Sequence, residues 1–169
     1  GDDFLQGGAG TNAVQAGDGN DVIDVSGRSS VLDTIDGGAG TDTLQISNGV
    51  SLAGAQISNI EVITSTNGGN FTFTTSALAA WGVQRLENLT VSLAAPGTFD
   101  GSAISGDYQV LGSTGNDVIR TGSGNNLINA RAGVADVSAG AGDDRVLYQP
   151  AATDWQESDA TKANFISGD

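Results

Sequence analysis

The chain has 169 residues, enough for one domain of ordinary size, and its 20 acidic against 6 basic residues give a formal net charge of −14. This acidic excess argues against nucleic acids and anionic membrane surfaces as partners, because both are bound by basic patches. The absence of cysteine and histidine excludes disulfides and thiolate metal sites, and it removes the commonest general base. No apolar run approaches the roughly twenty residues of a membrane span.

The segment 1–45 repeats a nine-residue pattern, G-G-x-G-x-D-x-U-x, in which U is a large aliphatic residue. Its copies read "GGAGTNAVQ", "AGDGNDVID" and "GGAGTDTLQ", and the chain begins inside a further copy, "GDDFLQ". The aliphatic position recurs at nine-residue intervals in two runs, Leu5, Val14 and Ile23, then Ile35 and Leu44. Between the two runs the loop "VSGRSSVLD" carries a three-residue insertion. A fixed period of this kind predicts a repeat architecture.

Residues 46–111 lack the nonapeptide but still have β-sequence character. The stretches "ISNIEVIT", "NFTFTT" and "LENLTVSL" alternate in polarity or are rich in β-branched residues, and Gly-Gly and Asn-Gly pairs separate them. The stretch "SALAAWG", residues 76–82, is consistent with one short helical turn. We expect 46–111 to continue a solenoid in longer coils that lack the repeat, although a separate globular domain inserted between two repeat blocks is the alternative.

The nonapeptide returns over residues 112–147. Its copies read "GSTGNDVIR", "TGSGNNLIN" and "AGAGDDRVL", with a degraded copy, "ARAGVADVS", before the last. The aliphatic positions are again nine apart, at Ile119, Ile128, Val137 and Val146. Residues 148–169 are expected to form a loop or short helix that leads into a further repeat, "ISGD". Both ends of the chain are therefore expected to cut through a longer solenoid.

These repeats resemble the RTX family, the calcium-binding nonapeptides of toxins and other secreted bacterial proteins. The resemblance covers 1–45 and 112–147 and implies an all-β fold, a parallel β-roll or β-helix solenoid. Each nonapeptide would form one turn and one short strand, and two of them would complete a coil. More loosely, a "GGAGTDTL" repeat followed by a strand such as "ISNIEVIT" resembles bacterial surface-layer proteins and large adhesins.

Calcium is the cofactor that the resemblance implies. Calcium takes six to eight oxygens, from carboxylates and carbonyls alike, and glycine lets a turn bring its carbonyls close to an ion. The aspartates have an alternative role as ordinary turn residues, which need no metal. The candidate calcium ligands occupy the sixth position of the repeat or its glycine turn, and they are Asp3, Asn12, Asp21, Asp33, Asp42, Asp117, Asn126 and Asp144, with Gly17, Gly19, Gly38 and Gly40.

In a β-roll, successive nonapeptides alternate between two edges. One edge would therefore carry Asp3, Asp21 and Asp42, and the central Asp21 would be shared by two calcium sites. The other edge would carry Asn12 and Asp33. Because it has one carboxylate, one amide and an enlarged loop, we expect it to bind calcium weakly or not at all.

Other residues give weaker signals. Trp81 and Trp155 suggest either carbohydrate stacking or, as we favour, packing against the solenoid. Glu61 and Glu87 are conceivable as a catalytic carboxylate pair, but solvated strand positions explain them adequately. A chain without histidine and with one lysine has almost no side chains that could form a nucleophile–base pair.

The sequence thus favours a non-enzymatic, calcium-stabilised solenoid segment of a large secreted or cell-surface bacterial protein, of surface-layer or adhesin type. The alternative is an auxiliary or secretion module of a secreted enzyme whose catalytic domain lies outside this chain. The expected partners are calcium ions, flanking repeats of the same parent chain, and, through self-assembly or binding, further copies or a cell-surface glycan. The resemblance also implies type I export and folding outside the cell, where calcium is abundant.

Overall fold

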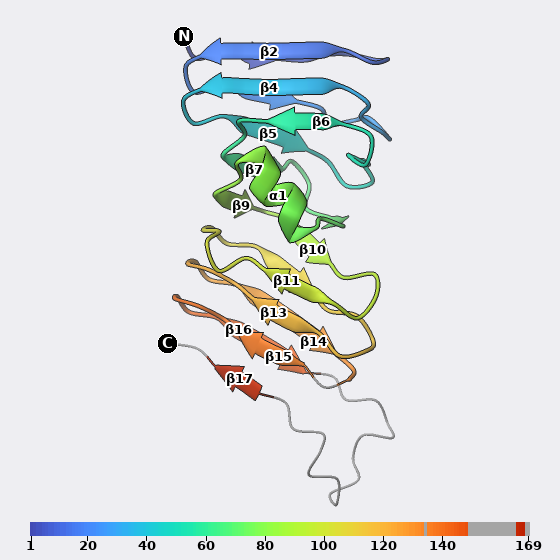
Figure 1. The fold of residues 1–169 in the computed structure, drawn as a ribbon, viewed down its shortest axis with the longest axis vertical. Helices are drawn as coiled ribbons and strands as arrows, with labels where there is room; N and C mark the ends of the chain where they lie inside the picture. Colours follow the sequence, from blue (N-terminus) through green and yellow to red (C-terminus); the bar gives the residue numbers. More distant parts are fainter. Residues whose placement is uncertain (134, 149–164, 168–169) are drawn as a thin grey trace, which may run out of the picture. The chain divides into compact units, whose positions relative to one another are not determined.

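The structure, a computed structural model, describes residues 1–133, 135–148 and 165–167. Its residue contacts divide the chain into two compact units, Gly1–Leu89 and Thr90–Asp169. Each unit is built largely of short parallel strands that lie above one another in successive coils (Figure 1).

The first unit contains two parallel sheets. One has the strand order β1-β3-β5-β7-β9 and the other β2-β4-β6, so strands that follow one another in the chain alternate between the sheets. The bounds of the first sheet are β1 Phe4–Leu5, β3 Val22–Asp24, β5 Thr43–Ile46, β7 Val62–Ser65 and β9 Arg85–Glu87. Those of the second are β2 Ala13–Asp18, β4 Thr34–Ala39 and β6 Gln56–Ser58, and the short strand β8 spans Asn70–Phe71.

A single short helix interrupts the β-structure of this unit. Helix α1 spans Thr75–Trp81 and packs beside β6. The hydroxyl of Thr74 caps its first turn by accepting a hydrogen bond from the backbone N–H of Ala77 at 3.1 Å. Gly82 ends it in the left-handed conformation, at φ 91°. The helical turn expected over residues 76–82 is therefore present.

The second unit also has two parallel sheets. One contains β10, β12, β14 and β16 and the other β11, β13, β15 and β17, each in that order. The bounds of the first are β10 Thr90–Ser92, β12 Gln109–Leu111, β14 Leu127–Arg131 and β16 Arg145–Tyr148. Those of the second are β11 Thr98–Asp100, β13 Val118–Arg120, β15 Asp136–Ser138 and β17 Phe165–Ser167.

The aliphatic position of the repeat forms the core of each coil. Leu44 in β5 lies in register between Ile23 and Ile63 of the neighbouring strands, and all three side chains are fully buried. Ile128 in β14 is likewise aligned with Val110 in β12 and is fully buried. Burial of one such side chain is worth about 1.5–3 kcal/mol. A solenoid that stacks one of them per strand therefore requires a large aliphatic residue at a fixed interval.

The predicted fold class, an all-β parallel solenoid, is confirmed. Strands from 46–111 that lack the nonapeptide still pair in parallel, as β6 does with β4 and β10 with β12. The finer division of the chain at residues 45, 111 and 147 remains a prediction. The loop or helix expected from residue 148 falls mostly outside the described residues, while β17 pairs with β15 so that Ile166 is opposite Val137. Among the described residues, no helix has the length and apolar character to cross a membrane.

Candidate calcium-binding edges

The sixth position of each repeat lies directly before a strand, where the chain turns into the next sheet. Asp3, Asp21 and Asp42 precede β1, β3 and β5, which are neighbours in one sheet. The structure therefore places these three aspartates in one column, which Glu61, directly before β7, extends. We call Asp3, Asp21, Asp42 and Glu61 the carboxylate edge.

Hydrogen bonds connect the members of the carboxylate edge from coil to coil. The backbone N–H of Asp3 donates to Oδ1 of Asp21 at 2.7 Å, and that of Asp21 donates to Oδ1 of Asp42 at 2.9 Å. The backbone N–H of Asp42 in turn donates to Oε2 of Glu61 at 2.9 Å. Each donor satisfies only one oxygen of the carboxylate that accepts from it.

The second oxygens of two carboxylates have no partner. Asp21 and Asp42 are fully buried, and Oδ2 of each is without a hydrogen bond. Burial raises the pKa of Asp42 above its ordinary value, and the charges of Asp21, Glu61 and Asp36 add to this effect. A buried carboxylate that has one unsatisfied oxygen and no positively charged partner disfavours folding, and a cation at this edge would offset that cost.

The glycine turns beside these aspartates bring backbone carbonyls together. Gly38 and Gly40 have φ values of 99° and 142°, in the left-handed region that favours glycine. A Cβ atom on Gly38 would collide with the carbonyl oxygen of Gly17, and one on Gly40 with that of Gly19. Successive turns are therefore stacked in direct contact.

These residues fit calcium better than other metals. Across residues 1–133, 135–148 and 165–167, no three acidic side chains converge into a ready-made metal cluster. An ion at this edge would therefore need carbonyl oxygens from the glycine turns as well as the free Oδ2 atoms of Asp21 and Asp42. Mixed carboxylate and carbonyl ligation in an irregular turn is typical of calcium.

The opposite edge of the first unit is different. Asn12 and Asp33 precede β2 and β4, and the backbone N–H of Asn12 donates to Oδ1 of Asp33 at 2.9 Å. Here Arg28, from the inserted loop, forms an ion pair with Asp33 at 2.5 Å between Nη1 and Oδ2. The hydrogen bond from Arg28 lowers the pKa of Asp33 below its ordinary value, although burial opposes it. Because its carboxylate already has a cationic partner, Asp33 is a poorer candidate calcium ligand than Asp21 or Asp42.

The second unit brings Asn126 and Asp144 together on one edge, since the backbone N–H of Asn126 donates to Oδ1 of Asp144 at 2.8 Å. Asp117 belongs to the other edge and is almost fully buried. Its Oδ1 accepts from the backbone N–H of Gly97 at 3.1 Å and its Oδ2 from that of Ser113 at 2.8 Å. Since protein donors occupy both oxygens, Asp117 is a poorer candidate ligand than Asp21 or Asp42.

Glu61 is the residue of the carboxylate edge that the repeat pattern missed. Its sequence context, "EVI", places an acidic residue two positions before the buried Ile63, as "DTL" does for Leu44. That signal was available, but the glycine turn that marks the other copies is absent. Glu87 has a separate partner, since it forms an exposed ion pair with Arg85 at 2.6 Å. Glu61 and Glu87 therefore have different structural roles.

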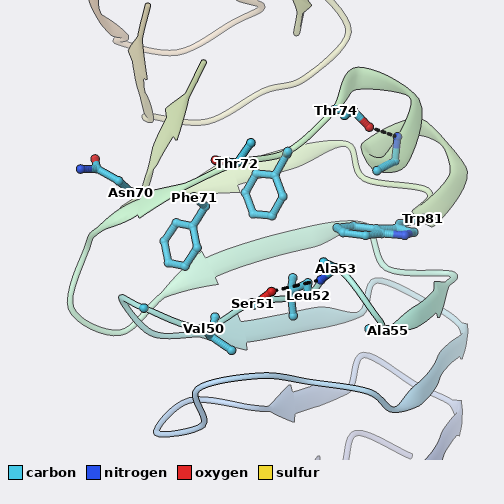
Figure 2. Close-up of a pocket in the computed structure, with 13 residues that line it drawn as sticks. Val50, Ser51, Leu52, Ala53, Ala55, Asn70, Phe71, Thr72, Thr74 and Trp81 are labelled. Carbon is cyan, nitrogen blue, oxygen red and sulfur yellow. Dashed lines mark hydrogen bonds between the residues drawn. The ribbon is translucent and has the colours of Figure 1, made fainter. Parts of the chain in front are cut away.

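As expected, Trp81 packs against a neighbouring side chain. Its ring lies edge-on to Phe73, with centroids 6.1 Å apart. Both line a pocket of about 710 Å³ between the loop 49–55 and the segment 70–81, shown in Figure 2. Its lining has hydroxyl and amide groups but no charged side chain. Trp155 lies outside the described residues.

The close stacking of the turns gives a direct test. Gly40→Ala is expected to lower the denaturation midpoint strongly, because the added methyl group meets the Gly19 carbonyl oxygen. Gly8→Ala is the matched control, since Gly8 also has a positive φ, of 70°, but open space around its Cα. Chemical denaturation in calcium compares the two variants, and equal losses would show that backbone strain alone, without close approach, accounts for the effect.

The buried charge of Asp42 gives a second test. Asp42→Asn retains an oxygen for the N–H of Asp21 but removes the charge. Without calcium at pH 7, this variant should be more stable than the wild type, because a raised pKa means that the folded state disfavours the ionised carboxylate. For the same reason, the free energy of unfolding of the wild type in chelator should rise as the pH falls through the pKa of Asp42.

With calcium the order should reverse, because the substitution removes a ligand. The matched control is Asp2→Asn, which changes an exposed aspartate that also accepts a backbone N–H, from Asn20 at 2.8 Å. Urea denaturation with and without chelator measures both. A loss of stability in chelator as large as that in calcium would contradict the account of a charge in need of a cation.

Comparison with known proteins agrees with this geometry. A family profile of the RTX calcium-binding nonapeptide repeat matches the chain in four copies, over residues 1–27, 33–45 and 111–146. The interruption at 28–32 falls in the inserted loop that contains Arg28. No curated protein and no solved structure shows significant similarity to the chain. By these matches and by its parallel β-solenoid fold, the chain contains RTX calcium-binding nonapeptide repeats over residues 1–27, 33–45 and 111–146.

Proposed function

We propose that this chain is a structural, calcium-stabilised β-solenoid segment of a large secreted or cell-surface protein, of surface-layer or adhesin type. RTX calcium-binding repeats in a β-solenoid support a structural, calcium-binding role. The proposal goes further in assigning calcium to particular residues and in placing the parent protein outside the cell.

The observation that carries the proposal is the pair of free, fully buried Oδ2 atoms of Asp21 and Asp42 on the carboxylate edge. Calcium there would be held by these two carboxylates, with Asp3 and Glu61 as the flanking members of the column. The glycine turns at Gly17, Gly19, Gly38 and Gly40 would add carbonyl oxygens. When bound, the ion supplies the positive charge that the buried carboxylates lack.

The chain's own charge explains why such a segment would respond to calcium. At −14, its acidic groups repel one another in a compact state, and the glycine-rich turns are costly to order. Because the metal site exists only in the folded state, the free energy of binding is also free energy of folding. A chain that is loose without calcium and compact with it suits export in an unfolded form and folding outside the cell.

The coils without the nonapeptide favour the structural role over an auxiliary module of an enzyme. Residues 46–111 continue each unit in parallel strands with buried aliphatic and aromatic side chains, which extends the solenoid beyond what calcium alone would stabilise. We propose no catalytic activity, because Glu61 accepts a hydrogen bond within the carboxylate edge and Glu87 pairs with Arg85. Flanking repeats and further copies are the proposed partners. A cell-surface glycan is another, and the neutral pocket beside Trp81 is its proposed position.

A titration of the intact chain tests the proposal. Calcium should raise the melting temperature and the β-sheet signal in circular dichroism, and magnesium at matched ionic strength should do so much less, because it dehydrates reluctantly and demands octahedral geometry. Asp21→Ala should remove more bound calcium than Asp3→Ala, because Asp21 has carboxylates on both sides. Asp42→Ala should resemble Asp21→Ala, since Glu61 follows it. Equal stabilisation by both ions would reduce the effect to charge screening and defeat the proposal.

A further inference from the structure

The inserted loop, residues 25–33, brings one arginine onto the edge opposite the carboxylate edge. Nη1 of Arg28 lies 2.5 Å from Oδ2 of Asp33, and Nη2 lies 3.3 Å from Oδ1 of the same carboxylate. Nη2 also donates to the carbonyl oxygen of Gly10 at 2.7 Å. The arginine side chain is only 16% exposed and that of Asp33 is fully buried. This is a bidentate ion pair withdrawn from solvent, the kind in which guanidinium geometry matters most.

The two edges are otherwise built alike. At each, a backbone N–H donates to Oδ1 of an aspartate on the next coil, from Asn12 to Asp33 and from Asp21 to Asp42, both at 2.9 Å. They differ at the second carboxylate oxygen. Oδ2 of Asp42 has no partner, whereas Oδ2 of Asp33 is bound by Arg28.

The guanidinium also contacts the second kind of oxygen that a calcium ion would require. Gly10 belongs to the glycine turn of the repeat whose sixth residue is Asn12, so its carbonyl is the counterpart of the turn carbonyls on the carboxylate edge. Arg28 therefore bridges a buried carboxylate and a turn carbonyl from two successive loops. The family profile is interrupted at residues 28–32, which include Arg28.

We propose that Arg28 is a built-in cation that closes the Asn12/Asp33 edge in place of calcium, so that this edge is formed without calcium and binds none. A guanidinium bound to these oxygens repels a divalent ion from them. In the first unit, calcium would then act on the carboxylate edge alone. The contrast between an edge that binds calcium and an edge that does not is the part that rests on the proposed function. The structural role of the Arg28–Asp33 ion pair is independent of calcium.

The apolar character of the following loops on this side fits the same assignment. Val31 in the inserted loop is fully buried, and the backbone N–H of Val31 donates to the carbonyl of Ser51 at 2.8 Å. Val50 and Leu52 in the next loop are buried as well. Along this edge, the glycine turn that contains Gly10 is followed by loops that bury aliphatic side chains. Arg28 lies in the first of these loops.

The test is a double-mutant cycle in calcium with a count of bound ions. Asp33→Asn, Arg28→Gln and the double variant are compared with the wild type by urea denaturation in saturating calcium, and calcium stoichiometry is measured by calorimetric titration. Each single variant should lower the urea midpoint, and the double variant should lose less than the sum of the two, because the partners act as a pair. Asp33→Asn should bind as many calcium ions as the wild type.

Arg85→Gln is the matched control, because it removes the same charge from an arginine that is 55% exposed and paired with Glu87. It should leave both the midpoint and the stoichiometry unchanged. Loss of a calcium ion in Asp33→Asn would overturn the proposal, since Asp33 would then be a ligand. An Arg28→Gln urea midpoint equal to that of Arg85→Gln would also overturn it. Losses of stability that are additive in the double-mutant cycle would do the same. If the wild type bound no calcium, the proposed function would fail, and the cycle in plain buffer would still decide the role of Arg28.

Discussion

The structure depends on one recurring interaction, a backbone N–H that donates to an acidic side chain on the next coil. On the carboxylate edge it joins Asp3 to Asp21, Asp21 to Asp42 and Asp42 to Glu61. The interaction fixes the register of the turns and therefore of the strands that follow them. It also forces the carboxylates of Asp21 and Asp42 into buried positions, where mutual repulsion and lost hydration oppose folding. The order of the coils and the requirement for a cation thus have the same origin.

The two edges of the first unit meet this requirement differently. The carboxylate edge leaves Oδ2 of Asp21 and of Asp42 free beside stacked glycine turns, which is an arrangement that an external divalent ion can complete. The opposite edge carries its own cation in Arg28, at the cost of a longer loop. A solenoid with one edge of each kind keeps part of its framework independent of the ion and leaves the rest responsive to it.

The nine-residue period predicted much of this from the sequence. It placed large aliphatic residues at a fixed interval, and the resemblance to RTX repeats that it carries implied the parallel solenoid and the grouping of Asp3, Asp21 and Asp42. Glu61 was missed because a longer side chain replaces aspartate and no glycine turn marks the position. The role of Arg28 was missed because an insertion has no register, so the sequence does not say which oxygens its side chain will reach. The contact of Trp81 with Phe73 depends on how α1 folds back, which the spacing of the two residues does not encode.

The difference between the edges is tested most directly by amide hydrogen exchange at two matched positions, the backbone N–H groups of Asn12 and Asp21. Each donates to a buried aspartate at 2.9 Å. The Asn12 N–H binds Asp33, whose carboxylate is paired with Arg28, and the Asp21 N–H binds Asp42, whose Oδ2 is free. Residue-resolved exchange is measured by NMR in calcium and again after its removal. The account predicts that the Asp21 amide loses its protection when calcium is removed while the Asn12 amide keeps most of its own. Equal loss at both amides, or no loss at either, would contradict it.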